Sequence, residues 1–212
     1  MTSRDLDFLD AADVADPLLR SPAVAQQWEQ PSALEDMTVG MLACHLARQL
    51  TRAASLLPAP AEEVETLPAA ADHYRRAAWV TATDLDDPAL DRSTDASEAA
   101  LGRDAMLARW GSARDDVEAL VGSGAVQDVV TIPWQGWSLQ RADFLLTRLV
   151  EVVTHTDDLA RSVGLPTPAF PDAVFTPVLH LLATLAAERH GQADLVSALT
   201  RRERMPSTIS AF

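Results

Sequence analysis

The sequence contains no lysine, no asparagine and a single cysteine, Cys44. A lone cysteine excludes an intrachain disulfide and a zinc site built from several cysteines. All 17 basic residues are therefore arginine, and 31 acidic residues outweigh them to give a net charge of −14. An electrostatic field of that sign repels phosphate, and no basic cluster offsets it. We therefore expect neither nucleic acid nor an anionic membrane surface as a partner.

Long apolar runs are also missing from the chain. The longest nearly apolar stretch, residues 174–187, contains Pro177 and His180 and is too short to span a bilayer. The first ten residues, MTSRDLDFLD, are acidic and lack the basic start and apolar run of a signal peptide. These features predict a cytoplasmic protein that does not enter the membrane.

The 212 residues are long enough for a sizeable core, and 48% of them are hydrophobic. Apolar residues recur every three or four positions, which predicts an all-α helical bundle. Ser138 is a good N-cap for a helix over residues 138–164. We expect helices over residues 5–28 (interrupted at Pro17 and Pro22), 38–56, 69–83, 95–122, 138–164 and 171–191, and a short strand-like piece over residues 129–132. Residues 1–165 are predicted to form the bundle, and residues 166–212 a helical extension that packs on it within one domain overall.

One pair of side chains has the spacing of metal ligands. Glu151 and His155 are four residues apart and therefore share one helix face. His45 lies at the edge of the apolar stripe of helix 38–56, so packing of the two helices would bring it beside that pair. Two imidazoles and one carboxylate are the protein ligands of catalytic zinc sites and of the Fe(II) facial triad. Cys44 points about 100° away from His45 on a helix, and we expect it to be a buried bystander.

Spacing alone also allows a simpler interpretation. A Glu–His pair four residues apart is common as a helix-surface contact, and a single histidine at the edge of an apolar stripe is usually a packing residue. Asp158 could accept a hydrogen bond from the free ring nitrogen of His155, or it could be a solvated acid near the end of the helix. On spacing alone, the metal site is one of two open hypotheses.

Three further residues could line a pocket beside these candidate ligands. Arg52 follows His45 by two helical turns and could bind a carboxylate of a substrate or thiol, or form a surface salt bridge. Trp134 and Trp137 precede the helix that contains Glu151 and could form a wall of the pocket, or simply pack against the end of the bundle.

Three stretches of the chain resemble a known family. Residues 28–48 contain the motif His45-Leu-Ala in the second helix, residues 148–159 have the pattern Arg-x-x-Glu-x-x-x-His-x-x-Asp-Leu, and the tail comprises residues 201–212. Together they resemble the DinB-like metal-binding bundle, specifically its mycothiol-dependent maleylpyruvate isomerase branch. The resemblance implies a DinB-like four-helix bundle with additional C-terminal helices. It also implies metal ligands at His45, Glu151 and His155, a divalent cation that is usually zinc, and mycothiol as the thiol co-substrate in actinobacteria.

The resemblance further implies an enzyme in which a metal-bound thiolate attacks a small electrophilic substrate, either as a thiol S-transferase or as a maleylpyruvate isomerase. Characterised isomerases of the family carry a larger C-terminal module that supplies a substrate-binding arginine, whereas only residues 172–212 follow Pro171 here. Two alternatives therefore remain: a non-catalytic module that binds a metal or small ligand, and a metal-assisted hydrolase. We expect a monomer or a homodimer.

Overall fold

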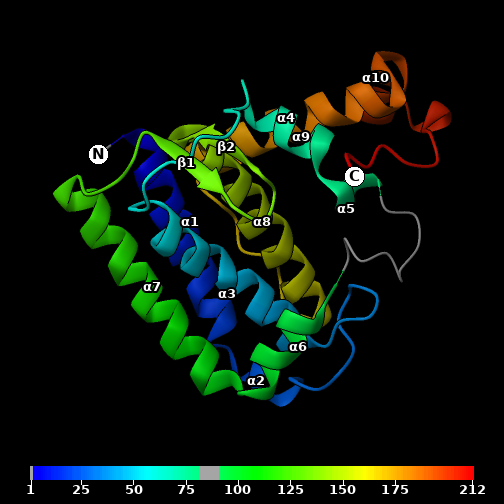
Figure 1. Ribbon diagram of the computed structural model, residues 1–212. Coiled ribbons are helices and arrows are strands. Elements are labelled where there is room, and N and C mark those ends of the chain that lie inside the picture. Colours follow the sequence, from blue (N-terminus) through cyan, green and yellow to red (C-terminus); the bar gives the residue numbers. More distant parts are fainter. Residues whose placement is uncertain (1, 82–90) are drawn as a thin grey trace.

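Four long helices form the bundle at the centre of the molecule (Figure 1). They are α1 (Ser3–Leu19), α3 (Val39–Leu56), α7 (Arg103–Ser123) and α8 (Arg141–Ser162). The computed structural model describes residues 2–81 and 91–212. Helix α3 packs on α7 and α8, and α1 packs on α8 and α7. The predicted all-α, DinB-like fold is confirmed.

The core of the bundle forms where the apolar stripes of the helices meet. In α3, Leu42, Leu46 and Leu50 are fully buried, and in α8 Leu149 and Leu159 are as well. These residues recur at three- or four-residue spacing, so each helix buries one face against its neighbours. His45, Glu151 and His155 lie beside these stripes and are half-buried, as expected for residues on the flank of a buried face.

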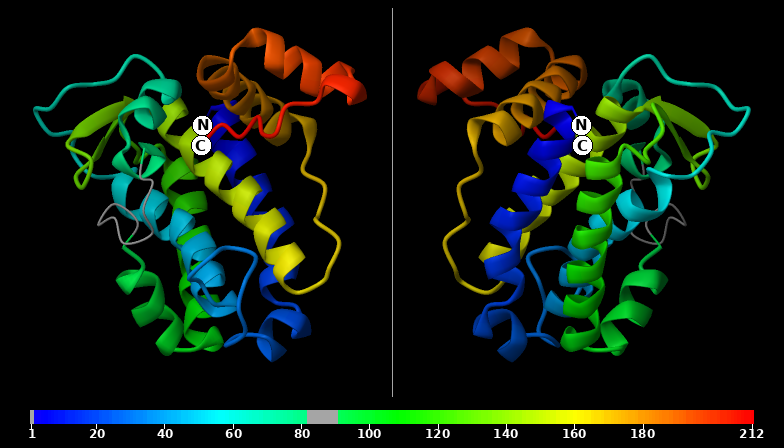
Figure 2. Two further views of the ribbon diagram at one scale, coloured as in Figure 1. Left: turned by 90° about the vertical axis from the view of Figure 1, so that its right-hand side faces the viewer. Right: turned by 90° about the vertical axis from the view of Figure 1, so that its left-hand side faces the viewer.

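Further helices cover the two ends of the bundle. Helix α2 (Pro22–Gln26) and helix α6 (Ser93–Ala100) lie at one end, and α9 (Asp172–His190) and α10 (Gln192–Thr200) lie at the other (Figure 2). Helix α9 packs on α8 and α1, and α10 packs on α9. After the short 3₁₀ turn η2 (Arg202–Arg204), the tail returns towards α5 (Ala78–Thr81). Within residues 2–81 and 91–212, no helix is both long enough and apolar enough to cross a membrane.

A two-stranded hairpin precedes α8 and corrects one prediction. Strands β1 (Val129–Ile132) and β2 (Trp137–Gln140) are antiparallel, with Val129 opposite Gln140. The expected strand over residues 129–132 is present. Ser138, however, is fully buried in β2 and does not cap a helix. Its hydroxyl lies 2.9 Å from that of Thr131, and its backbone pairs with residues 65 and 67. Helix α8 therefore begins three residues later than predicted.

Three helix boundaries also differ from the predicted ranges. Helix α1 continues through Pro17 to Leu19, so this proline does not interrupt the helix. The predicted helix over 95–122 is split into α6 and α7 by Gly102, whose φ of +85° suits glycine. The predicted helix over 69–83 is split at Ala77 into α4 (Ala70–Arg76) and α5. The end of that predicted range, beyond residue 81, lies outside the described residues.

The segment before α3 is fixed by close packing between Trp28 and Gly40. A Cβ atom at Gly40 would lie 2.5 Å from the indole ring, so only glycine leaves room for it. The indole nitrogen of Trp28 donates a hydrogen bond of 3.2 Å to the carbonyl of Ala99 at the end of α6. Trp28 thereby ties α6 to the beginning of α3, the helix that contains His45.

Candidate metal centre and pocket

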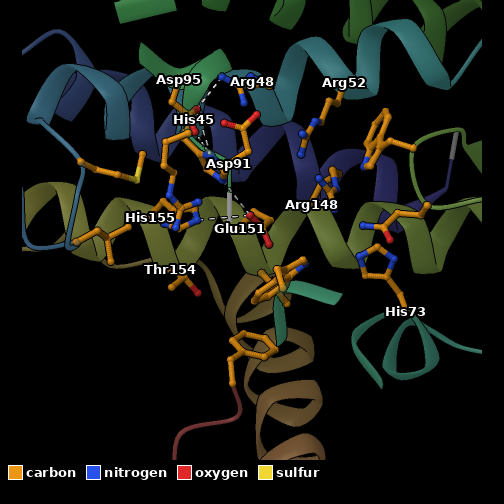
Figure 3. A pocket seen from close by; sticks show the side chains of 18 residues that line it. His45, Arg48, Arg52, His73, Asp91, Asp95, Arg148, Glu151, Thr154 and His155 are labelled. Atoms are coloured by element: carbon orange, nitrogen blue, oxygen red, sulfur yellow. Dashed lines mark hydrogen bonds and ion pairs between the residues drawn. The ribbon is translucent and has the colours of Figure 1, made fainter. Parts of the chain in front are cut away.

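The structure brings His45, Glu151 and His155 together at the interface of α3 and α8. One ligand atom from each residue lies within 4.8 Å of the other two. The Glu151 Oε2 atom is 3.4 Å from Nε2 of His45 and 3.4 Å from Nε2 of His155. The two imidazole rings meet edge to face, with centroids 4.7 Å apart, and all three side chains point towards one another (Figure 3).

This spacing is compatible with ligands that share one divalent cation, and it is long for direct hydrogen bonds. Good N–H···O hydrogen bonds are about 2.7–3.2 Å long. Two atoms that are each about 2.1 Å from a tetrahedral cation are about 3.4 Å apart. The donor set of two imidazoles and one carboxylate is also the one that zinc uses when one coordination position remains open. The three residues therefore can hold a metal ion.

A second carboxylate contacts the far nitrogen of each histidine. Asp158 Oδ2 lies 3.0 Å from Nδ1 of His155, and Asp95 Oδ2 lies 3.3 Å from Nδ1 of His45. A carboxylate at Nδ1 keeps the proton on that nitrogen, and the Nε2 atom is then directed at the cation. Both imidazoles are thus oriented from behind towards Glu151.

Asp95 was missed in the sequence analysis. It is buried in α6, where Arg48 of α3 donates a 2.6 Å hydrogen bond to its Oδ1 atom. Arg48 also binds Glu98, so both acids face α3. The three-residue spacing of Asp95 and Glu98 resembles a helix-capping pattern and so does not point to a metal site. Fifty residues separate Asp95 from His45. Only the packing of α6 on α3 brings them together, and no local signal marks that contact.

The acids and histidines at this site favour one another's charged forms. Burial opposes charge on His155, but hydrogen bonds to Asp158 and Glu151 outweigh it and raise its pKa to about 9. Burial also opposes charge on Glu151, yet the two histidines hold its pKa well below the usual range. By contrast, burial raises the pKa of the Cys44 thiol to about 12, so the protein's own cysteine is not a ready nucleophile.

A pocket of about 290 Å³ opens beside the three candidate ligands. Asp95 and His155 line it at one end, and Arg52, Arg148 and His73 line it elsewhere (Figure 3). Within the described residues, neither Arg52 nor Arg148 forms an ion pair with an acid. Arg52 thus forms no surface salt bridge with any acid of the described residues, and its guanidinium lies 4.7 Å above the ring of Trp134.

The two tryptophans of the hairpin occupy different positions. Trp134 lines the pocket and is about half exposed. Trp137 lies outside the lining, and its indole nitrogen donates a 3.2 Å hydrogen bond to Nδ1 of His73, which does line the pocket. The sequence around His73 gives no sign of a functional role. Its hydrogen-bond partner, Trp137, lies 64 residues away in the chain, and no local pattern predicts such a contact.

Comparison with known proteins identifies a family for most of the chain. Residues 8–160, well over half of the chain, match the family described as the mycothiol maleylpyruvate isomerase N-terminal domain. No curated protein and no solved structure gives a significant match. The matched region contains all three candidate ligands and both acids behind them. The chain belongs to the mycothiol maleylpyruvate isomerase N-terminal domain family.

Proposed function

We propose that this protein is a metal- and mycothiol-dependent enzyme that transfers or reversibly adds the thiol to a small electrophilic substrate. The observation that carries the proposal is the convergence of His45, Glu151 and His155 beside a pocket. Family membership supports mycothiol as the thiol. We further propose zinc as the resident cation, because the donor set matches that of catalytic zinc sites.

Each residue near the centre has a distinct role in this proposal. A divalent cation bound here would lower the pKa of a thiol and keep it as the thiolate. His45 and His155 would hold that cation through Nε2, while Asp95 and Asp158 fix the orientation of the rings. Glu151 supplies the one negative charge among the three candidate ligands, which tempers the electrophilicity of the site.

The pocket residues would position the substrate. We propose that Arg52 binds a carboxylate of the substrate, and that Trp134 forms the wall behind the guanidinium. In the chemical step, the thiolate sulfur forms a bond to the electrophilic carbon. In transfer, a leaving group departs with its electron pair. In isomerisation, the carbon–sulfur bond breaks again after rotation about the adjacent carbon–carbon bond, and the thiolate is returned.

Metal analysis of the purified protein tests the centre itself. We expect about one zinc per chain, and loss of that metal in His45→Ala and in His155→Ala. Since removal of an outer partner alone weakens metal binding by about 10- to 100-fold, loss of a direct ligand should weaken it more. His180→Ala, which removes an exposed histidine, is the matched control. Metal content that stays the same in all three variants would contradict the proposal.

Thiol dependence is tested separately on the metal-loaded protein. Mycothiol should raise the melting temperature of the protein, because a ligand that binds the folded state stabilises it. Glutathione should raise the melting temperature less, because the proposal makes mycothiol the thiol that fits the pocket. Mycothiol with a bimane electrophile should then react faster than without enzyme. Binding without turnover would favour a non-catalytic module. Ester hydrolysis without any thiol would favour the hydrolase.

A further inference from the structure

His73 is a buried histidine whose protonation state is fixed by a neighbour that can only donate. It lies in α4, is 3% exposed, and its Nδ1 atom is 3.2 Å from the indole nitrogen of Trp137. An indole N–H cannot accept a hydrogen bond, so Nδ1 of His73 must be the acceptor and carries no proton. The imidazole is therefore neutral, and its one proton is on Nε2.

The Nε2–H group of His73 has no acceptor among the described residues, and the residue lines the pocket. The candidate metal ligands line the same pocket. His73 and His155 lie at opposite ends of this pocket, with Glu151 and Arg148 between them (Figure 3). The pocket thus has a metal end and an end that presents an unused hydrogen-bond donor.

Two guanidinium groups share the His73 end. Arg148 is buried and donates to Gln49 Oε1 at 2.7 Å and to the Thr147 hydroxyl, both of which are uncharged. Arg52 has no hydrogen-bond partner among the described residues and only lies over Trp134. Neither guanidinium is neutralised by a described acid within ion-pair distance.

The electrostatics of this end agree with the contacts. Burial and the charges of nearby guanidiniums lower the pKa of His73 to about 4, so it stays uncharged at neutral pH. Burial and repulsion from Arg148 likewise lower the pKa of Arg52 to about 10. Positive charge is therefore held here at a cost that a bound anion would relieve.

We propose that His73 and Arg52 form a carboxylate-binding subsite in which neutral His73 donates its Nε2–H to one oxygen and Arg52 binds the charge. This assignment rests on the proposed function only in treating the carboxylate as part of the electrophilic substrate. His73 then determines specificity, because an uncharged donor of fixed direction selects an oxygen at one position. The pocket of about 290 Å³ suits a short carboxylic acid.

The protonation state of His73 can be measured without any ligand. In protein labelled with ¹⁵N-histidine, two-bond ¹H–¹⁵N correlations should show His73 as the neutral Nε2–H form from pH 6 to pH 8. In Trp137→Phe, which removes the indole donor, the two neutral forms should both be populated. An imidazolium at pH 6, or the Nδ1–H form in the unmodified protein, would overturn the proposal.

Ligand binding tests the subsite with succinate as the carboxylate probe and succinamide as its uncharged counterpart. Calorimetry should show binding of succinate and not of succinamide. Arg52→Gln and His73→Phe should each weaken succinate binding by about tenfold or more, because each removes a charge-assisted hydrogen bond. His73→Gln retains a donor and should lose less, and His180→Gln should change nothing.

Chelator-treated protein identifies where the probe binds. Succinate binding should persist after removal of metal, since the proposed donors lie at the other end of the pocket. Binding that disappears with the metal would place the carboxylate on the cation and overturn the subsite. Because no thiol is present in these measurements, the subsite can hold while mycothiol-dependent turnover fails, and turnover can occur while the subsite fails.

Discussion

The two ends of the pocket place the same type of side chain in opposite electrostatic surroundings. At the metal end, His155 lies between the carboxylates of Glu151 and Asp158, and its pKa rises to about 9. At the other end, His73 is buried near Arg52 and Arg148, and its pKa falls to about 4. Neighbouring charges thus decide whether a buried imidazole binds a proton or excludes it.

In the proposed function, this contrast gives the two ends of the pocket different roles. The acids behind the histidines would orient the lone pairs and favour a cation, whereas the arginines beside neutral His73 would provide donors and favour an anion. A substrate with a carboxylate at one end and an electrophilic carbon at the other would match both ends at once.

The largest expected effect comes from the acid behind His45. Asp95→Asn should weaken metal binding by about 10- to 100-fold, because the imidazole loses the carboxylate that fixes its orientation. Glu98→Gln is the control, since Glu98 binds the same Arg48 but does not touch His45. Competition with a chromophoric chelator measures both affinities. Equal losses in the two variants would show that only the Arg48 contacts matter.

Metal binding should also depend on pH. The raised pKa of His155 means that its proton stabilises the metal-free fold below about pH 6.5, and that this contribution is lost as the pH rises to about 9. That proton must leave before Nε2 binds a cation. Metal affinity should therefore rise by up to about tenfold per pH unit between pH 7 and pH 9, then level off.

Chelator competition repeated over this pH range measures how metal affinity changes with pH, and Asp158→Asn tests whether His155 causes that change. The amide oxygen of asparagine can still accept from Nδ1–H, but it lacks the negative charge that helps to raise the pKa of His155, so the plateau should move to lower pH. Asp157→Asn changes an adjacent acid that pairs instead with Arg161, and it should leave the profile in place. A metal affinity that is constant from pH 7 to pH 9 would contradict the role of His155.

Gly40→Ala should disturb the metal end through packing. The new Cβ would clash with Trp28, at a cost of about 1–3 kcal/mol in the free energy of unfolding. Because Trp28 also holds the end of α6, metal affinity should fall while succinate binding is retained. Gly111→Ala in α7, where a Cβ meets nothing within 4 Å, should be neutral or stabilise by up to about 1 kcal/mol. Urea denaturation measures both, and equal stability of the two variants would contradict this account.

The smallest effect is expected at the other end. Trp134→Ala removes the ring beneath Arg52, and a partly exposed cation–π contact contributes about 0.5–1 kcal/mol. Succinate binding should weaken by a factor of about two to five, with metal affinity unchanged. Leu101→Ala, at an exposed residue outside the pocket, controls for loss of surface. A larger loss of metal binding than of succinate binding would break the division between the ends.

The metal end could be largely anticipated from the sequence because helical periodicity is a local property. The four-residue spacing places Glu151 and His155 on one face of α8, and the apolar stripe places His45 at the edge of α3. Spacing alone leaves the metal site open, and the family resemblance joins the three residues into one candidate set. The three-residue spacing of His155 and Asp158 allows their contact, which the structure shows. Contacts between residues three or four positions apart on one helix can be predicted without knowledge of the tertiary structure.

The remaining features depend on contacts between distant segments. Asp95 reaches His45 only because Gly102 separates α6 from α7 and lets α6 pack on α3. The partner of His73 is Trp137, 64 residues away in a strand of four residues. Strand β2 pairs with β1 and also with the segment around Leu67, so its polar Ser138 is buried by pairing that no local pattern reveals.

The hairpin has a consequence for how the protein could be diversified. Its turn supplies the platform under Arg52, and the first residue of its second strand dictates the tautomer of His73. Neither residue comes from the two helices that supply the candidate ligands. Exchange of the short segment 133–137 between related chains would therefore change the proposed carboxylate subsite and leave the helices of the candidate metal ligands unaltered.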